Sequence, residues 1–345
     1  PFEHPRATRA ALALPTLEQM TDRLIEIRSR VFDRLEALKW NDANPLLKGG
    51  YVYNMVLQHE YQHNETILQT LQLKRGEPYQ PPRRIAFDTT ESSTKGSRSS
   101  PPEMTRFDGS RVTIGTNDRA AAYDNERPQH EVDLRPFLID RTPVTNGQYI
   151  DFISDNGYKR QDLWSEAGRR WVAETGVVAP KHWFRDGDAW KSRVMDLTRP
   201  VDPNCPVCHV CYHEAEAFAK WAGKRLPTEF EWEAAASWDP SANAAREFPW
   251  GDSAANSGLA NIDQLSFDIA PIDTYKTNVS PIGCYGMIGD VWEWTSSDFS
   301  GYPGFESFPY REYSEEFFGS EYKVLRGGSW ATRPGAIRNT FRNWD

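Results

Sequence analysis

The sequence predicts an α+β protein in which a helical segment precedes one larger domain of short strands, short helices and irregular loops. Three observations support this fold class. Helical periodicity dominates residues 16–73, whereas short strand-like runs alternate with turns after residue 104. The 345-residue chain also holds 13 tryptophans, a density of large aromatic side chains that suits a loop-rich core.

Two helical patterns come first, one from Thr16 to Leu38 and one from about Leu47 to Leu73. Thr16 and Gln19 have the spacing of a capping box at the start of the first helix. The apolar face of the first helix comprises Leu17, Met20, Leu24, Ile27, Val31, Leu35 and Leu38. The predicted inner face of the second includes Val52, Met55, Val56, His59, His63, Thr66 and Thr70. Two helices cannot close a bundle, so this helical part is expected to be incomplete.

A stretch rich in Pro, Ser and Gly then separates the helices from the rest of the chain. We therefore predict a helical domain at residues 1–80, a linker or loop at 81–103 and an α+β domain at 104–345. Within the last we expect strands at Val112–Gly115, Phe137–Asp140 and Val324–Gly327. Helices are expected to begin near Thr145, His213 and Thr228, the last with Glu231 in a capping box.

The bulk composition excludes several classes of protein. Forty basic and forty-nine acidic residues give a net charge of −9, which argues against a nucleic-acid partner. No run approaches the 18 or so apolar residues of a membrane span, and Pro1–Arg9 does not form a secretory signal. Four cysteines do not make a disulfide framework, so a cytoplasmic location is expected.

The segment His59–His63 carries the first chemical signal. The two imidazoles are four residues apart, on one helix face and about 6 Å from each other, so both can bind one metal ion. The alternative is a pair of hydrogen-bonded histidines inside a bundle. The segment also fits the zinc-peptidase pattern H-E-x-x-H, but a metzincin would have Gly and His where this chain has Thr66 and Gln69.

The longer string His59–Thr66 resembles the metal motif in the DinB-like domain of ergothioneine-biosynthesis sulfoxide synthases. The downstream half resembles their formylglycine-generating-enzyme-like domain, a variant of the C-type-lectin fold. The segments that carry this second resemblance are Asp124–His130, Pro143–Asn146, Trp221–Glu229, Gly289–Thr295 and Leu325–Trp330. The resemblance implies a partial DinB-like helical bundle, followed by the lectin-like domain.

The resemblance implies an enzyme that uses non-haem Fe(II) and O2 to join a thiol to the imidazole of hercynine (trimethylhistidine). In the family three histidines hold the iron; His59 and His63 match two of them, and the third has no match in this chain. Cysteine and γ-glutamylcysteine are both candidate thiol donors.

The resemblance also assigns substrate contacts. Arg6, Arg9 and Asp345 match residues that bind the thiol substrate, through its carboxylates and its amino group. Gln62 matches a residue that hydrogen-bonds the imidazole substrate. Asn343 and Trp344 match the site for the other end of that substrate, where an aromatic face would suit a trimethylammonium group.

Tyr302, in a Gly- and Pro-containing loop, is the candidate catalytic tyrosine, because a phenol can give a proton to an oxygen intermediate and take it back. Tyr285 and Tyr310 are less favoured candidates, and the alternative for Tyr302 is packing against a tryptophan. Lectin-like domains of this type often carry structural Ca²⁺, for which Asn261, Asp273 and Glu293 offer oxygen ligands.

Cys205, Cys208 and Cys211 are spaced like half a zinc knuckle, but without a second cysteine pair they favour packing. The alternatives to the hercynine-directed enzyme are an ovothiol-type synthase acting on plain histidine, a selenium-transferring relative, a zinc peptidase and a non-catalytic lectin-like binding module.

Overall fold

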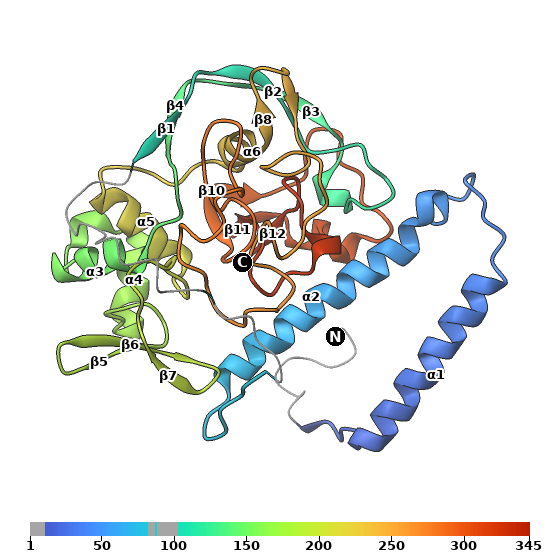
Figure 1. Ribbon diagram of the computed structural model, residues 1–345, viewed down its shortest axis with the longest axis horizontal. Coiled ribbons are helices and arrows are strands. Elements are labelled where there is room, and N and C mark those ends of the chain that lie inside the picture. Colours follow the sequence, from blue (N-terminus) through green and yellow to red (C-terminus); the bar gives the residue numbers. More distant parts are fainter. Residues whose placement is uncertain (1–10, 82–86, 88–102) are drawn as a thin grey trace. The chain divides into compact units, whose positions relative to one another are not determined.

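The computed structural model describes residues 11–81, 87 and 103–345, and Figure 1 traces the chain. It divides into two compact units, Pro1–Gly49 and Gly50–Asp345. Arg6 and Arg9 lie outside the described residues, as does most of the predicted linker. The second predicted helix belongs to the larger unit, so the boundaries at residues 80 and 103 stay a prediction.

The smaller unit holds helix α1, Leu17–Glu36. The predicted capping box is present: the Thr16 hydroxyl accepts from the Gln19 backbone N–H at 3.2 Å, and the Gln19 side chain accepts from the Thr16 N–H at 2.9 Å. These two bonds satisfy helix-end donors that have no partner within the helix. None of the residues of α1 is buried.

The larger unit contains the remaining helices and all the described strands. Its helices are α2 (Tyr51–Leu73), α3 (Asn146–Ser154), α4 (Glu166–Thr175), α5 (Tyr212–Trp221) and α6 (Glu229–Ser237). Its strands are β1 (Met104–Phe107), β2 (Ser110–Ile114), β3 (His130–Leu134), β4 (Phe137–Asp140), β5 (Trp183–Asp186), β6 (Ala189–Val194), β7 (Leu197–Pro200), β8 (Trp238–Asp239), β9 (Ala244–Ala245), β10 (Glu293–Phe299), β11 (Gly319–Arg326) and β12 (Asn343–Trp344). Short 3₁₀ turns are η2 (Lys48–Gly50), η3 (Asp124–Glu126), η4 (Gln161–Leu163), η5 (Arg311–Tyr313), η6 (Glu315–Phe317) and η7 (Pro334–Ala336).

The strands form small antiparallel sheets rather than one large one. The described sheets have the orders β1-β4, β2-β3, β5-β6-β7, β8-β9 and β10-β11-β12. In the last sheet Trp344 lies opposite Val324, and Asn343 lies opposite Leu325. The sequence-predicted strands and the helix starts near Thr145, His213 and Thr228 are confirmed.

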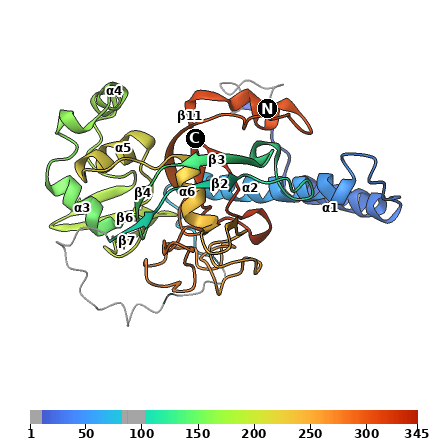
Figure 2. The ribbon, with the colours of Figure 1, turned by 90° about the horizontal axis from the view of Figure 1, so that it is seen from above.

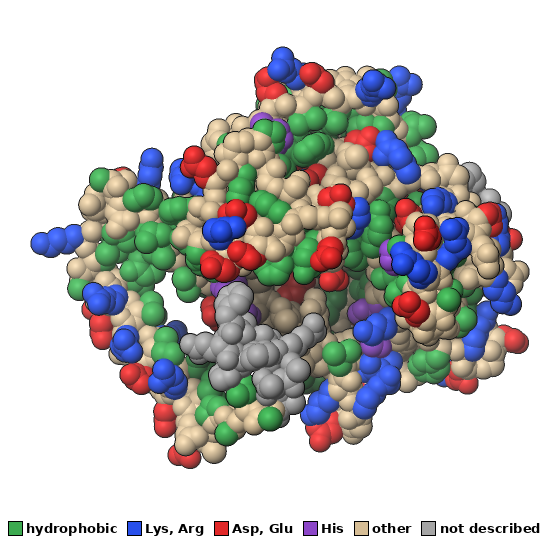
Figure 3. Space-filling view, turned by 180° about the vertical axis from the view of Figure 1, so that it is seen from behind, with side chains coloured by type: hydrophobic (Ala, Val, Ile, Leu, Met, Phe, Trp, Pro, Cys, Tyr) green, Lys and Arg blue, Asp and Glu red, His purple; other side chains and the backbone are tan. Residues whose placement is uncertain are grey.

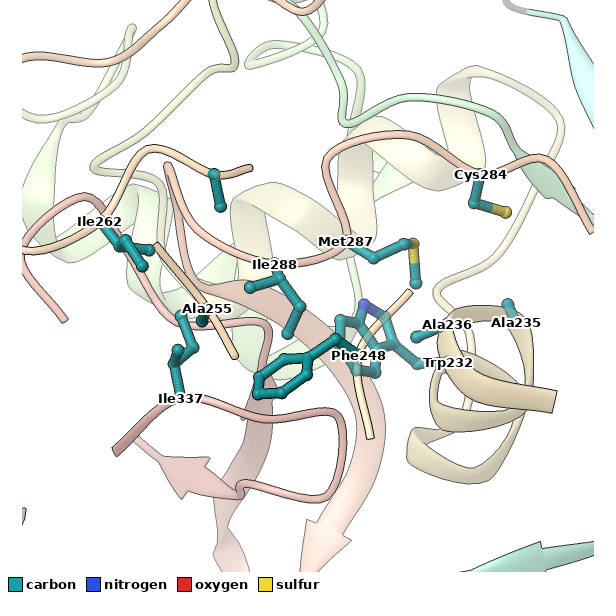
Figure 4. Close-up of a cluster of buried hydrophobic side chains, with 11 residues drawn as sticks. Trp232, Ala235, Ala236, Phe248, Ala255, Ile262, Cys284, Met287, Ile288 and Ile337 are labelled. Carbon is teal, nitrogen blue, oxygen red and sulfur yellow. The ribbon is translucent and has the colours of Figure 1, made fainter. Parts of the chain in front are cut away.

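Helix α6 is the centre of the larger unit. It contacts β2, β3, β10 and β11, and Figure 2 shows it beside β2 and β3. Its Trp232 lies in a cluster of buried side chains with Phe248, Met287 and Ile288, drawn in Figure 4. This cluster brings together residues from α6 and from several loops, which agrees with the loop-rich aromatic core expected from the tryptophan content.

Three buried arginine–glutamate pairs connect the last part of the chain to the core. They are Arg326 with Glu233, Arg338 with Glu126, and Arg342 with Glu229, each with both side chains at most 9% exposed. The C-terminal segment is therefore fixed by charge pairs as well as by its strand pairing.

On the face shown in Figure 3, acidic and basic side chains are interspersed. Within the described residues, no helix combines the length and the apolar character that a membrane span requires.

Candidate metal and substrate site

Helix α2 lies on the lectin-like part of the larger unit through polar side chains. Gln58 donates to the Ala121 carbonyl at 2.8 Å and accepts from Arg338 at 3.0 Å. In the last turn of the helix, Gln72 donates to the Arg193 carbonyl at 2.8 Å and accepts from the Met195 N–H at 2.6 Å. Three of these four contacts are with backbone groups and the fourth is with the Arg338 side chain, so α2 has a defined register on the domain.

The buried face of α2 differs from the one expected from the sequence. Tyr51, Met55, Gln58, Leu68 and Gln72 are buried. Of the predicted inner face only Met55 is buried; Val56, His63, Thr66 and Thr70 are exposed. Hydrogen-bonded glutamines provide much of the contact between α2 and the domain. The buried face of the helix is therefore rotated relative to the predicted one.

His59 and His63 lie together at the edge of that buried face. Their ring centroids are 4.5 Å apart with the planes tilted by 46°. Burial, and next the neighbouring His63, lower the pKa of His59, although Glu60 opposes them. A neutral imidazole is the form that binds a metal ion, and two rings this close can share one ion at ordinary metal–nitrogen distances of about 2.1 Å.

The donor set in the described part of the chain is incomplete. No group of three or more His, Cys, Asp or Glu side chains suited to a metal ion occurs among residues 11–81, 87 and 103–345. His59 and His63 therefore fit two positions of an imidazole-bound metal, with its other positions open to further ligands.

Tyr313 joins the histidine pair to the predicted substrate residues. Its hydroxyl donates to the Gln62 side-chain oxygen at 3.1 Å, and its ring lies edge-on to His59 at 6.0 Å. The ring also stacks on Tyr123 at 4.5 Å. Burial, and next the adjacent Tyr123, raise the pKa of Tyr313 well above its ordinary value, so its hydroxyl keeps its proton.

Strand β12 brings the C-terminal residues to the same place. Trp344 lies edge-to-face with Tyr313 at 6.2 Å and stacks on Phe299 at 4.2 Å with an interplanar angle of 10°. Asn343 is half-buried, and Asp345 is exposed and pairs through its backbone with Lys323. His59, Gln62 and Trp344 thus all lie around Tyr313.

Tyr302 lies elsewhere, in the core of the domain. It is 3% exposed, its hydroxyl donates to Glu229 at 3.4 Å, and Arg342 lies 4.2 Å above its ring. Its ring packs with His130 and Phe230 rather than with α2. The Gly- and Pro-containing loop of Tyr302 predicted an accessible tyrosine. In the structure Tyr302 is buried against the Arg342–Glu229 pair.

The sequence did not single out Tyr313, although Tyr310 was considered. Tyr310 is 40% exposed and lies edge-to-face with Tyr313, with 6.4 Å between the ring centroids. The segment Tyr310–Tyr313 therefore presents the tyrosines of this site. The only sequence signal for them was their position between the fold segments Gly289–Thr295 and Leu325–Trp330, which does not distinguish them from Tyr302.

The residues suggested for calcium and zinc are used otherwise. Asn261 donates to the Asp268 carbonyl and to Asp290, whereas Glu293 accepts from Trp232 at 3.0 Å, and Asp273 is exposed. None of these hydrogen bonds joins one of the three candidate calcium ligands to another. The four cysteines are free thiols, and burial raises the pKa of Cys208 to about 12, which favours the packing interpretation.

A cavity of about 530 Å³ lies away from the histidines. Its walls are mostly apolar and come from the two edge strands β4 and β10 and from α5 and α6. No residue of α2 lines it, so the histidine pair does not open into it. Glu293 is an acid in this apolar wall, and burial raises its pKa from 4.5 to about 7 despite the bond from Trp232.

This raised pKa predicts a pH dependence of stability. Between about pH 4.5 and 7 the folded state keeps a proton that the unfolded chain has lost, so stability should fall as pH rises through this window. Glu293→Gln should remove its share of the dependence, leaving that of Asp290, whose pKa burial also raises to about 7, and should stabilise the protein at pH 8 by about 3 kcal/mol. Urea unfolding at pH 5 and pH 8 measures this, and an unchanged pH slope in the variant would contradict it.

The comparisons with known proteins agree with the fold. The profile of the Sulfatase-modifying factor enzyme 1-like domain matches residues 89–345. A formylglycine-generating enzyme of Streptomyces coelicolor is 36% identical over 210 residues, which cover 51% of this chain and 62% of that protein. The lectin-like part is thus a domain of the formylglycine-generating-enzyme type.

Two relatives match the whole chain, the histidine helix included. A hercynine oxygenase of Mycolicibacterium thermoresistibile is 41% identical over 348 residues, covering 100% of this chain and 75% of that protein. One of Mycobacterium tuberculosis is 41% identical over 347 residues, covering 100% of this chain and 78% of that protein. The chain belongs to the hercynine oxygenase family and is an oxygenase.

Proposed function

We propose that this enzyme joins the sulfur of a thiol to the imidazole carbon of hercynine, with Fe(II) and O2, and releases a sulfoxide in ergothioneine biosynthesis. The S–H bond of the thiol and a C–H bond of the ring break, and a C–S bond forms. One oxygen atom of O2 ends on sulfur, and the other leaves as water with the two hydrogens. The four electrons that O2 accepts thus come from forming the C–S bond and from oxidising the sulfur.

The convergence of His59, Gln62 and Trp344 around Tyr313 is the observation that carries this proposal. His59 and His63 would hold the iron, which when bound supplies the activation of O2 and a place for both substrates. Gln62, one residue before His63, would hydrogen-bond the imidazole of hercynine. The Tyr313 hydroxyl donates to the Gln62 carbonyl oxygen and so directs the amide N–H₂ group toward the opposite side.

Trp344 would receive the trimethylammonium end of the substrate. Phe299 covers one face of the indole, so the cation would meet the other one. Asn343 precedes it in β12, and Asp345 follows it on the exposed side, where it would pair with the amino group of the thiol substrate. Arg6 and Arg9 lie outside the described residues and are proposed as thiol-binding residues from the family resemblance alone.

We further propose cysteine or γ-glutamylcysteine as the thiol donor and a cytoplasmic location. The free state of Cys205, Cys208, Cys211 and Cys284 supports a reducing compartment.

The test of the function is mass spectrometry of the products of the intact, iron-loaded protein with O2 and hercynine. Cysteine and γ-glutamylcysteine are supplied in separate reactions, and oxygen uptake is recorded. We expect a sulfoxide adduct that contains both substrates. An adduct with plain histidine and none with hercynine would move the assignment to the ovothiol type. No adduct and no oxygen uptake would refute the proposal.

The positions of the tyrosines predict different effects of removing each hydroxyl. Tyr310→Phe removes a part-exposed phenol, and we expect a loss of about 10²- to 10⁴-fold in sulfoxide formation, the range of general acid–base catalysis. Tyr313→Phe removes one bond to Gln62 and should cost about tenfold. Tyr302→Phe should leave the rate within about twofold, because its hydroxyl contacts only the buried Glu229 side chain.

Single-turnover rates and product ratios for the three variants decide between them. A loss of C–S bond formation in Tyr302→Phe, with Tyr310→Phe and Tyr313→Phe unaffected, would restore Tyr302 as the catalytic tyrosine.

A further inference from the structure

Glu65 is a charged residue of α2 that is neither a proposed metal ligand nor a proposed substrate contact. It lies on the same side of the helix as Gln58 and Gln62, since positions i, i+4 and i+7 share one face. Its carboxylate accepts three side-chain hydrogen bonds: from Trp292 Nε1 at 2.7 Å, from Ser329 Oγ at 2.5 Å and from Thr332 Oγ1 at 3.0 Å.

The three donors come from the loop before β10 and from the connection between β11 and β12. Trp292 immediately precedes β10, and Ser329 and Thr332 follow β11 on the way to β12. The last two form their own turn, because the Ser329 N–H donates to the Thr332 hydroxyl at 2.9 Å and the Thr332 N–H donates to the Ser329 carbonyl at 3.0 Å. This turn is buried and presents both hydroxyls to α2.

The buried apolar contacts of α2 are few, so the rotation of the helix about its axis depends on such polar bonds. Only three apolar side chains of the helix, Tyr51, Met55 and Leu68, are buried. Burial of apolar surface is not directional in itself, whereas a carboxylate that accepts three hydrogen bonds requires one orientation of the helix. Hydrogen bonds to a charged acceptor are also roughly twice as strong as neutral ones. Glu65 therefore helps to fix the rotation of the helix near its histidines, together with Gln58 beside His59.

Rotation of α2 decides where the metal would sit. Successive residues are about 100° apart around the axis, so a turn of a few tens of degrees moves the imidazoles of His59 and His63 by several ångströms. It would also break the bond between Gln62 and Tyr313. Trp292 transmits the same constraint to the tyrosine cluster, since it packs on Phe341, which packs on Tyr123.

We propose that Glu65 is a positioning residue that sets the rotation of the histidine helix, so that His59, His63 and Gln62 meet the substrate residues of β12 in a productive geometry. This inference rests on the proposed function, because the productive geometry is that of the metal with hercynine. Glu65 itself touches neither substrate nor metal in this arrangement.

The test compares Glu65→Gln with Gln72→Ala in the intact protein. Glu65→Gln keeps the size of the side chain but removes the charge and turns one acceptor into a donor that faces Thr332 or Ser329. Gln72→Ala removes two hydrogen bonds from the same helix, nine residues beyond His63. Both variants should lower Tm, but only the first should disturb the site.

For Glu65→Gln we expect kcat for sulfoxide formation to fall by about 10- to 100-fold, as for partners that orient metal ligands. The electron paramagnetic resonance signal of the iron–nitrosyl complex should broaden or split, and hercynine should perturb it less than in the wild type. Gln72→Ala should keep the wild-type signal and a kcat within about threefold. Glu65→Asp, which keeps the charge, should recover part of the loss.

Two results would overturn the inference: a Glu65→Gln variant with wild-type kcat and signal, or a Gln72→Ala variant whose kcat falls as much for the same loss of Tm. The nitrosyl signal without hercynine reports on the histidine geometry alone. A wild-type protein that makes no sulfoxide would therefore refute the proposed function while leaving this readout of Glu65 intact.

Discussion

Replacing His63 by alanine is expected to abolish iron binding by the intact protein and with it sulfoxide formation. The loss should exceed the roughly 10- to 100-fold that follows removal of a hydrogen-bond partner of a metal ligand, because here the ligand itself is removed. His59→Ala should behave alike, since the two rings lie 4.5 Å apart and would hold the same ion. Iron content per protein and oxygen uptake with both substrates measure the effect.

Gln69→Ala is the matched control, because Gln69 is exposed on the same helix. It should keep both iron content and rate. Helical circular dichroism distinguishes loss of the metal from loss of α2. Full iron content in both histidine variants would show that the pair is structural, the alternative that the sequence left open.

The fold was predictable wherever local sequence determines local structure. The capping boxes at Thr16 and Thr228 marked the helix starts that the structure shows. The run Phe137–Asp140 coincided with β4, because short apolar runs between turn residues are typical of strands. The arrangement of the sheets did not follow from such signals, because a local pattern does not show which strands pair. Strand β1 pairs with β4 rather than with β2, whereas β5, β6 and β7 pair in chain order.

The site was predictable only where its residues are close in sequence. Four-residue spacing on a helix brought out His59 and His63, and the family resemblance added Gln62, Asn343 and Trp344. Tyr313 escaped because its bond to Gln62 spans 251 residues and it belongs to a 3₁₀ turn without periodicity. The helix face was misassigned for another reason: hydrophobic patterns do not register a helix that docks through glutamines.

The largest loss of stability is expected from breaking the buried pair of Arg342 with Glu229. Arg342 Nε and Nη2 donate to the two carboxylate oxygens at 2.8 and 2.9 Å, and the side chains are 0% and 4% exposed. Arg342→Gln leaves the carboxylate of Glu229 buried without its counter-charge, which costs about 3–5 kcal/mol. It also removes donors from the carbonyls of Asn125 and Ser300. Chemical denaturation of the wild type and the variant gives the difference.

Glu231, two residues after Glu229 in α6, offers a control for this prediction. Arg225 makes an equally regular two-bond pair with Glu231, at 2.7 Å for both contacts, but its side chain is 64% exposed. Water screens that pair, so Arg225→Gln should cost no more than about 1 kcal/mol. The two variants thus differ in burial rather than in bond geometry. Equal losses of unfolding free energy in both variants would mean that hydrogen-bond geometry, and not the burial of charge, fixes the C-terminal segment to α6. A much larger loss for Arg342→Gln means that the buried Arg342–Glu229 pair holds β12, and with it Trp344, against the core.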